Sequence, residues 1–214
     1  MSAKPRRKPA AKGNQLLPEF ALFVGKTGSG KSYAMWNKYQ EWNARDPKQT
    51  LVWSPKERHD NYAMQLRCKA HTVPAEFVRD VIAGKHAVFV PSGSRTENEK
   101  IFDLFYCRLA MKLAIEQKRP TCLLVDEIHT VTRPNGGTQW WDELVRMGRG
   151  DGIRFLASTP RPIDVDKGFF GALSYAHVAS LQYEDDAKTC AKLVLCSMAE
   201  VMALTGYEAK TRSM

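Results

Sequence analysis

Short apolar runs alternate with amphipathic stretches along the chain. Each run spans four to seven residues and ends at glycine, proline or polar residues, as buried strands do. The predicted strands cover residues 19–24, 50–53, 86–90, 121–125, 153–158 and 175–181. Between them, helical spacing of apolar residues predicts helices over residues 31–43, 74–83, 97–117 and 140–147, with one or two more after 181. Strands that alternate with helices indicate an α/β fold, with a mainly parallel sheet covered by helices on both faces.

The longest predicted helix, residues 97–117, carries an apolar stripe. We expect this stripe to face the sheet, because a surface helix buries its apolar side against the core. Its members are Ile101, Leu104, Phe105, Leu109 and Leu113.

Length and composition indicate one globular domain. The 214 residues suit a single α/β domain, predicted over residues 16–214 with a C-terminal helical extension. With 43% hydrophobic and 26% charged residues, the chain is neither disordered nor collagen-like. No apolar run approaches the ~18 residues of a membrane-spanning helix, and none follows the first charges as in a secretory signal. The five scattered cysteines are typical of reduced thiols in a cytoplasm-like compartment.

Positive charge is concentrated at the start of the chain. The net charge is +9, and five of the basic residues fall within the first thirteen positions without any acid: Lys4, Arg6, Arg7, Lys8 and Lys12. We predict a basic flexible tail over residues 1–15. One interpretation is a solubilising terminus, and the other is an arm that binds nucleic acid. Five phosphate contacts would give a log–log salt slope of about −4.5, so binding by the tail alone would be weak and salt-sensitive.

A glycine-rich segment joins the first predicted strand to the first predicted helix. Its sequence GKTGSGKS, residues 25–32, matches the pattern GxxxxGK[ST] at every fixed position. Glycines let backbone amides turn toward a phosphate, and the start of the following helix adds its positive dipole. Lys31 would reach the β and γ oxygens, and the Ser32 hydroxyl would bind Mg²⁺. A glycine-rich turn without a nucleotide is the alternative. The predicted nucleotide ligands are Gly25, Lys26, Thr27, Gly28, Ser29, Gly30, Lys31, Ser32 and Tyr33.

Two carboxylates end the fourth predicted strand. Asp126 and Glu127 follow the apolar run LLV, which places them at the edge of a parallel sheet where ligands bind. Asp126 is suited to hold the Mg²⁺ shell, and Glu127 is suited to orient and deprotonate an attacking water. An adjacent base of this kind favours hydrolysis over group transfer to a bound acceptor. The alternative is that both acids only cap the next helix. For His129, two residues further on, we prefer a histidine without a role over a nucleotide contact.

Two arginines precede the fifth predicted strand. Arg146 and Arg149 lie beside glycines, where they can project into a neighbouring subunit; plain surface charge is the alternative. A guanidinium placed on a γ-phosphate from a second subunit accelerates hydrolysis by roughly 10³ to 10⁵. Ser158 and Thr159 end this strand, so a hydroxyl there can contact the γ-phosphate.

The segments GKTGSGKS, LLVDE and RMGRGDGIRFLASTPRP together resemble the FtsK–HerA superfamily of P-loop motor ATPases, over about residues 19–182. Within it, the chain is similar to the genome-packaging ATPases of tailless icosahedral viruses with an internal membrane. The resemblance implies an additional-strand, catalytic-glutamate P-loop NTPase that binds ATP and Mg²⁺. It makes Arg149, or else Arg146, the arginine that acts in a neighbour's site. A glutamine often follows the strand-five threonine in this family. Pro160 stands there instead, so the polar sensor is Ser158 or Thr159, or it is missing.

The resemblance also implies a function. It predicts a homo-oligomeric ring, a pentamer or hexamer, that drives viral DNA into a preformed capsid and contacts capsid vertex proteins. Such a motor works in the virion or the host cytoplasm. Residues 132–138, with Arg133, are a candidate channel loop; for Trp140 and Trp141 we prefer packing over a channel contact. The alternatives are an assembly ATPase of the filamentous-phage and zonula-occludens-toxin kind, which is expected to span a membrane, and a non-motor nucleotide-dependent regulator.

Overall fold

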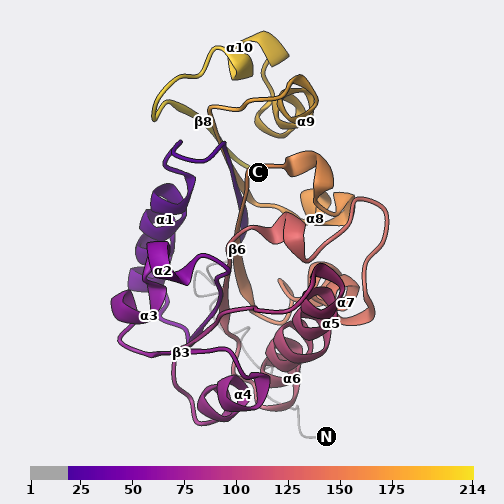
Figure 1. The fold of residues 1–214 in the computed structure, drawn as a ribbon. Helices are drawn as coiled ribbons and strands as arrows, with labels where there is room; N and C mark the ends of the chain where they lie inside the picture. The colour runs from indigo at the N-terminus through magenta and orange to yellow at the C-terminus, as the bar shows by residue number, and fades with distance from the viewer. Residues whose placement is uncertain (1–18) are drawn as a thin grey trace, which may run out of the picture.

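The computed structural model describes residues 19–214 and places one eight-stranded sheet at their centre (Figure 1). The strands lie in the order β3-β4-β2-β5-β6-β1-β7-β8. Seven run parallel, and β8 pairs antiparallel with β7 at one edge. The predicted, mainly parallel sheet is therefore confirmed, whereas the predicted basic tail lies outside the described residues. The strands are β1 (Phe20–Val24), β2 (Thr50–Trp53), β3 (Lys69–His71), β4 (Ala87–Phe89), β5 (Cys122–Val125), β6 (Arg154–Thr159), β7 (Tyr175–Ala179) and β8 (Ala209–Ser213).

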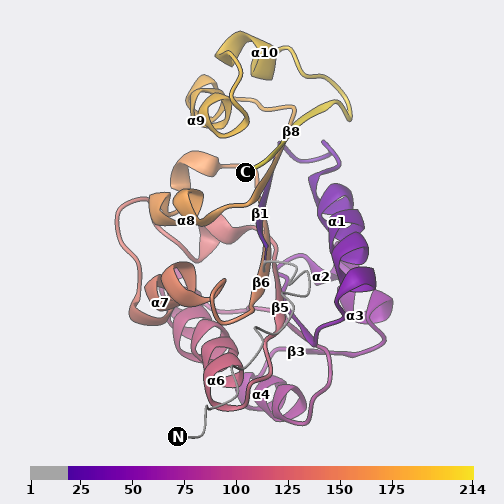
Figure 2. The same cartoon turned by 180° about the vertical axis from the view of Figure 1, so that it is seen from behind.

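Helices cover both faces of the sheet (Figures 1 and 2). One face carries α1 (Lys31–Arg45), α2 (Glu57–Asp60) and α3 (Tyr62–Gln65). The opposite face carries α4 (Pro74–Ile82), α5 (Arg95–Ile101), α6 (Arg108–Glu116), α7 (Gln139–Met147) and α8 (Lys167–Ala172). At the top of Figure 1 lie α9 (Glu184–Val194) and α10 (Met198–Met202). No helix among residues 19–214 is both long and apolar enough to cross a membrane. Short helical turns complete the fold: η1 (Phe102–Cys107), η2 (Ile128–Thr130) and η3 (Pro162–Asp164).

Alternate residues of each central strand enter different cores. In β1, Phe20, Leu22 and Val24 pack beneath the helices α4 to α8, and Ala21 and Phe23 pack beneath α1. All five are at most 1% exposed. Burial on both faces explains why the central strands are unbroken apolar runs instead of alternating ones.

The long helix predicted over residues 97–117 contains a π-helical segment, η1, between α5 and α6. The wider turn of a π-helix rotates the side chains that follow it relative to a regular α-helix. The predicted stripe is therefore wrong at two positions, because Leu104 and Phe105 are 47% and 42% exposed. Phe102 and Tyr106 take the buried positions instead.

Two edge strands were not predicted. β3 has the sequence KAH and β8 has the sequence AKTRS, neither of which contains an apolar run. An edge strand pairs on one side only and keeps polar side chains in water, so it lacks the signal that marks a buried strand. The predicted helical extension after residue 181 consequently ends in a strand, because β8 follows α9 and α10.

The side chain of Trp141 joins α7 to the sheet. It is 2% exposed, and its indole nitrogen Nε1 donates a hydrogen bond of 2.8 Å to Oδ2 of Asp166. Its ring centroid lies 5.5 to 5.8 Å from those of Phe102, Phe155 and Phe169. The preferred interpretation of this tryptophan as a packing residue is confirmed.

We expect Trp141→Ala to lower the free energy of unfolding by about 3–5 kcal/mol, because it leaves a cavity and removes the partner of a buried carboxylate. Urea unfolding measures the change. Met147→Ala on the same helix is the control, since this side chain is 50% exposed and should change stability by less than about 0.5 kcal/mol. Equal effects of the two substitutions would contradict the central position of Trp141.

Candidate functional site

Three neighbouring parallel strands bring the predicted motifs together. β6 lies between β1 and β5, so the carboxyl ends of all three meet at one edge of the sheet. The glycine-rich loop follows β1, the acidic pair follows β5, and Ser158 and Thr159 end β6. Val24 and Thr159 are register partners, which places the loop directly beside the end of β6.

The glycine-rich loop is fixed at its base by its neighbours. The amide of Gly25 donates to the carbonyl of Thr159 at 3.2 Å, and the amide of Lys26 donates to the carbonyl of Ser180 at 2.9 Å. A Cβ atom at Gly25 would lie 2.3 Å from Oγ of Ser29 and 3.1 Å from Cβ of Ala179, so a side chain here would force the Ser29 hydroxyl to move. Gly30, at the start of α1, has a φ of 81°, in the left-handed region that favours glycine.

The remaining loop residues divide into an exposed tip and a buried end. Lys26, Thr27 and Gly28 are exposed, whereas Lys31 is 5% exposed. Ser32 is half-buried in the first turn of α1. Tyr33, the next residue of α1, is 73% exposed, and its predicted contact with the nucleotide remains a prediction.

The acidic pair is almost completely buried. Asp126 is 1% exposed and Glu127 is 4% exposed. The hydroxyl of Ser158 donates to Oδ1 of Asp126 and accepts a hydrogen bond of 3.3 Å from the amide of Glu127. Glu127 has a φ of 55°, a left-handed conformation that turns the chain sharply at the end of β5. Such strain in a non-glycine residue costs of order 1–3 kcal/mol and is typical of functional sites.

Two ammonium groups contact one oxygen of Glu127. Nζ of Lys31 lies 3.8 Å from Oε1, and Nζ of Lys56 donates a hydrogen bond to the same oxygen. Burial works against the charged form of Lys56, yet this hydrogen bond and the neighbouring carboxylates raise its pKa above the ordinary value. The base candidate is therefore linked both to the phosphate loop and to the segment after β2.

His129 contacts the site, although we preferred a histidine without a role. Its Nδ1 atom lies 3.5 Å from Oε2 of Glu127 and 3.2 Å from Oγ1 of Thr159. Burial lowers the pKa of the imidazole below its ordinary value, against the opposing charge of Glu127. The ring is therefore mostly uncharged at neutral pH.

Sequence reasoning missed Lys56 and Asp60, which lie on the segment after β2. No motif marks them, but β2 pairs with β5, so residues that follow β2 reach the acidic pair. Burial and the charge of Asp126 raise the pKa of Asp60 to about 7. The signal that could have identified them is the run of polar residues after β2, the strand that pairs with β5.

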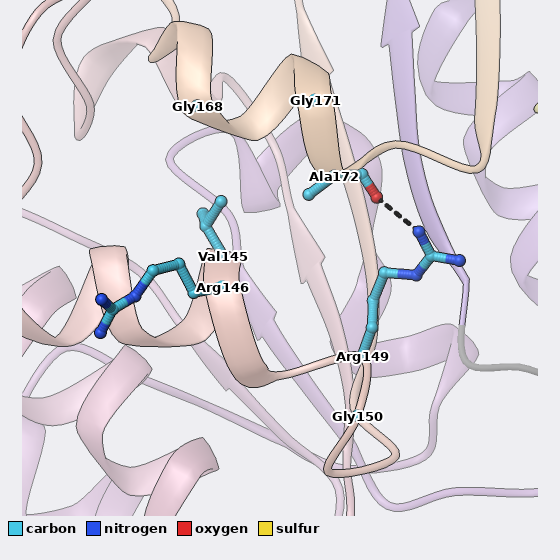
Figure 3. A pocket seen from close by; sticks show the side chains of 7 residues that line it. All are labelled: Val145, Arg146, Arg149, Gly150, Gly168, Gly171 and Ala172. Carbon is cyan, nitrogen blue, oxygen red and sulfur yellow. Dashed lines mark hydrogen bonds between the residues drawn. The ribbon is translucent and has the colours of Figure 1, made fainter.

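The two candidate arginines lie at the amino ends of the parallel strands, opposite the carboxyl ends where the motifs meet. Both precede β6, and the loop after α7 packs beside the start of β1, where a Cβ on Gly148 would lie 3.3 Å from the ring of Phe20. They border a cavity of about 570 Å³, from which Arg146 points away (Figure 3). Arg149 donates a hydrogen bond of 3.1 Å to the carbonyl of Ala172. Neither arginine therefore reaches the phosphate loop of its own chain.

The loop over residues 132–138 is tied back to the body of the protein. Arg133 forms two hydrogen bonds with Glu99, at 3.0 and 2.7 Å, so its charge is partly satisfied within the chain. Its predicted contact with nucleic acid remains a prediction.

The strand order and the placement of the motifs define an α/β P-loop NTPase fold. No family model and no curated protein matches the chain. Among solved structures, the genome-packaging NTPase B204 of Sulfolobus turreted icosahedral virus 2, in complex with sulfate, aligns with a TM-score of 0.71 and 15% identity over 92% of each chain. Its complex with ATPγS gives 0.68 and 17% identity over the same shares. VirB4 of Thermoanaerobacter pseudethanolicus aligns with a TM-score of 0.58 and 9% identity, over 92% of this chain and 88% of its own. At 9 to 17% identity these likenesses show a shared fold, which agrees with the P-loop NTPase fold that the sequence motifs predict.

The raised pKa of Asp60 predicts a pH dependence of stability. The folded chain holds a proton up to about pH 7 that the unfolded chain releases near its ordinary pKa of 3.8. This stabilisation is complete below about pH 4 and is lost as the pH rises through about 7. We expect Asp60→Asn to reduce the loss of unfolding free energy between about pH 5 and pH 8, measured with urea. Glu116→Gln, on the exposed side of α6, is the control. Identical pH slopes for wild type and Asp60→Asn would contradict the proximity of Asp60 to Asp126.

Proposed function

We propose that this protein hydrolyses ATP to move nucleic acid, and that it packages viral DNA into a preformed capsid. The observation that carries the hydrolytic part is the distance of 3.8 Å between Nζ of Lys31 and Oε1 of Glu127. The lysine that would hold the terminal phosphate and the carboxylate that would activate water thus face one small volume. Their segments follow β1 and β5, which β6 separates, so the sheet creates this proximity.

The residues at this edge fit a magnesium nucleotide. Within residues 19–214, Oγ of Ser29 is buried and has no hydrogen-bond partner, and the buried Oδ2 of Asp126 has only the neighbouring Asp60 carboxyl beside it. The Ser32 hydroxyl and the Asp126 carboxylate are hard oxygen donors of the kind that Mg²⁺ prefers. When bound, the cation would neutralise charge that develops on the phosphate oxygens.

The chain's own residues supply the remaining chemistry. Glu127 would accept a proton from the water that attacks the terminal phosphorus, and its buried carboxylate is shielded from bulk solvent. Ser158 binds both acids, through the carboxylate of Asp126 and the amide of Glu127, and so fixes their relative position. Lys56 would orient the Glu127 carboxylate through the oxygen that also faces Lys31.

The motor part of the proposal is supported by the comparison and by the two arginines. The genome-packaging NTPase B204 shares its fold with 92% of this chain. Because Arg146 and Arg149 lie at the edge opposite the phosphate loop, they could complete an active site only in a neighbouring copy. A ring of five or six copies would provide such neighbours. DNA would contact the basic tail and the loop over 132–138, and capsid vertex proteins would hold the ring, in the virion or the host cytoplasm.

We expect the protein to hydrolyse ATP with Mg²⁺, and its turnover to rise when DNA is added. Glu127→Gln should bind ATP as tightly as wild type but lose roughly 10²- to 10⁴-fold in turnover, because it removes the general base. ATPase rates with and without DNA, across protein concentrations, measure hydrolysis, assembly and coupling together. Glu116→Gln on the exposed side of α6 is the matched control. Full turnover by Glu127→Gln would reject the base assignment, and indifference to DNA would reject the motor.

Arg149→Ala should lose roughly 10³- to 10⁵-fold in turnover if its guanidinium stabilises charge in a neighbour's site. Mixing it with Lys31→Ala should restore part of the activity. In a mixed ring, an intact phosphate loop from one variant meets an intact arginine from the other. Titrating the two variants against each other in an ATPase assay tests this, with Arg146→Ala in parallel to identify which arginine acts. Absence of recovery for both arginines would exclude action between subunits.

A further inference from the structure

A second cavity adjoins the phosphate loop on the side away from the acidic pair. It encloses about 600 Å³ between the loop, the first turn of α1, β7 and the segment that joins α10 to β8. Gly28 and Gly30 of the phosphate loop line it, together with Tyr33, His177 and Tyr207. A molecule in this cavity would therefore touch the same loop that is proposed to hold phosphate.

Tyr207 forms the outer wall of this cavity. The side chain is 83% exposed, yet its ring lies against the phosphate loop, with Cδ1 3.0 Å from the position of a Cβ on Gly30. An ordered turn holds it there. The amide of Glu208 donates to the carbonyl of Thr205 at 3.0 Å, and Oε2 of Glu208 accepts from the Thr205 amide and hydroxyl at 2.9 and 3.1 Å. The structure thus presents a large aromatic ring to solvent beside the loop, on a turn that hydrogen bonds hold together.

The other walls are also aromatic or small, and they carry no fixed charge. Tyr33 projects from α1 and is 73% exposed. His177 packs its ring against Phe23 with centroids 5.6 Å apart, and burial lowers its pKa below the ordinary value, so the imidazole is uncharged at neutral pH. Ala34 completes the side formed by α1. This lining suits a flat, uncharged ring system better than an ion or a sugar.

Ser29 belongs both to the phosphate loop and to the lining of the cavity. Ser29 lines the cavity, is 3% exposed, and its Oγ has no hydrogen-bond partner in the described part of the chain. A buried hydroxyl without a partner destabilises the protein unless a ligand or water satisfies it. The Ser29 Oγ lies beside Gly25, 2.3 Å from the position of a Cβ there, so this hydroxyl belongs to the phosphate loop and the aromatic walls form the rest of the cavity.

We propose that this cavity binds the nucleobase of the nucleotide whose phosphates occupy the glycine-rich loop, with the base stacked on Tyr207. The proposal rests on the proposed nucleotide site and identifies which part of the chain recognises the base. Stacking on an aromatic side chain contributes about 1–3 kcal/mol per base. Because stacking grows with ring area, purine nucleotides should bind more tightly than pyrimidine nucleotides.

The test compares a ligand that has a base with one that has none. Affinities for ATP, CTP and inorganic tripolyphosphate are measured by calorimetry with Mg²⁺, for wild type, Tyr207→Ala and Tyr207→Phe. Tyr207→Ala should weaken ATP binding by roughly 5- to 150-fold and leave tripolyphosphate binding unchanged. Tyr207→Phe keeps the ring and should bind ATP as wild type does. Tyr183→Ala is the matched control, because this tyrosine is 48% exposed but packs on Arg161 and does not line the cavity.

Each result separates the base pocket from the phosphate site. Unchanged ATP affinity in Tyr207→Ala, or equal weakening of ATP and tripolyphosphate, would overturn the base pocket and leave the phosphate site intact. Wild-type protein that binds CTP as tightly as ATP would overturn the role of stacking area. Protein that binds neither ATP nor tripolyphosphate would overturn the proposed nucleotide site itself. Thermal unfolding of each variant verifies that the turn carrying Tyr207 remains folded.

Discussion

Two adjacent carboxylates at the carboxyl edge of the sheet are buried, and neighbouring cations and hydrogen-bond donors replace the water that they lose. Asp126 and Glu127 are 1% and 4% exposed, and charges so poorly hydrated persist only where cations or hydrogen-bond donors replace the lost solvent. The chain draws these groups from three segments: Lys31 after β1, Lys56 after β2 and Ser158 at the end of β6. The groups proposed to act on a nucleotide therefore also connect the carboxyl ends of four neighbouring strands, β2, β5, β6 and β1.

The sequence predicts those parts of the site whose residues follow one another along the chain. A glycine pattern between a strand and a helix specifies a phosphate loop, because its backbone alone forms the cradle. An acidic pair after an apolar run lies at the carboxyl edge of a parallel sheet for a similarly local reason. Lys56 belongs to no such pattern, since its contact with Glu127 exists only because β2 pairs with β5. His129 likewise depends on where β6 places Thr159.

The fold divides in the same way. Strands buried on both faces are legible as unbroken apolar runs, and the predicted central strands match the observed ones to within about two residues. The edge strands β3 and β8 are not predicted, because one side of each is solvated and their sequences contain no apolar run. The apolar stripe was predicted with the α-helical period of 3.6 residues per turn. The π-helical turn at Phe102–Cys107 departs from that period, so Leu104 and Phe105 lie outside the core.

The position of the two arginines constrains how copies of the chain can associate. In a contact related by a two-fold axis, the arginine end of each copy would have to meet the phosphate loop of the other, so both exchanges would occur in the same interface. In the proposed ring the association would instead be head-to-tail and heterologous, with the arginine end of each copy against the phosphate loop of the next. Successive copies then either close after a whole number of steps or continue as an open filament. The rotation per step decides between the two, and small changes in the loop between α7 and β6 would alter it.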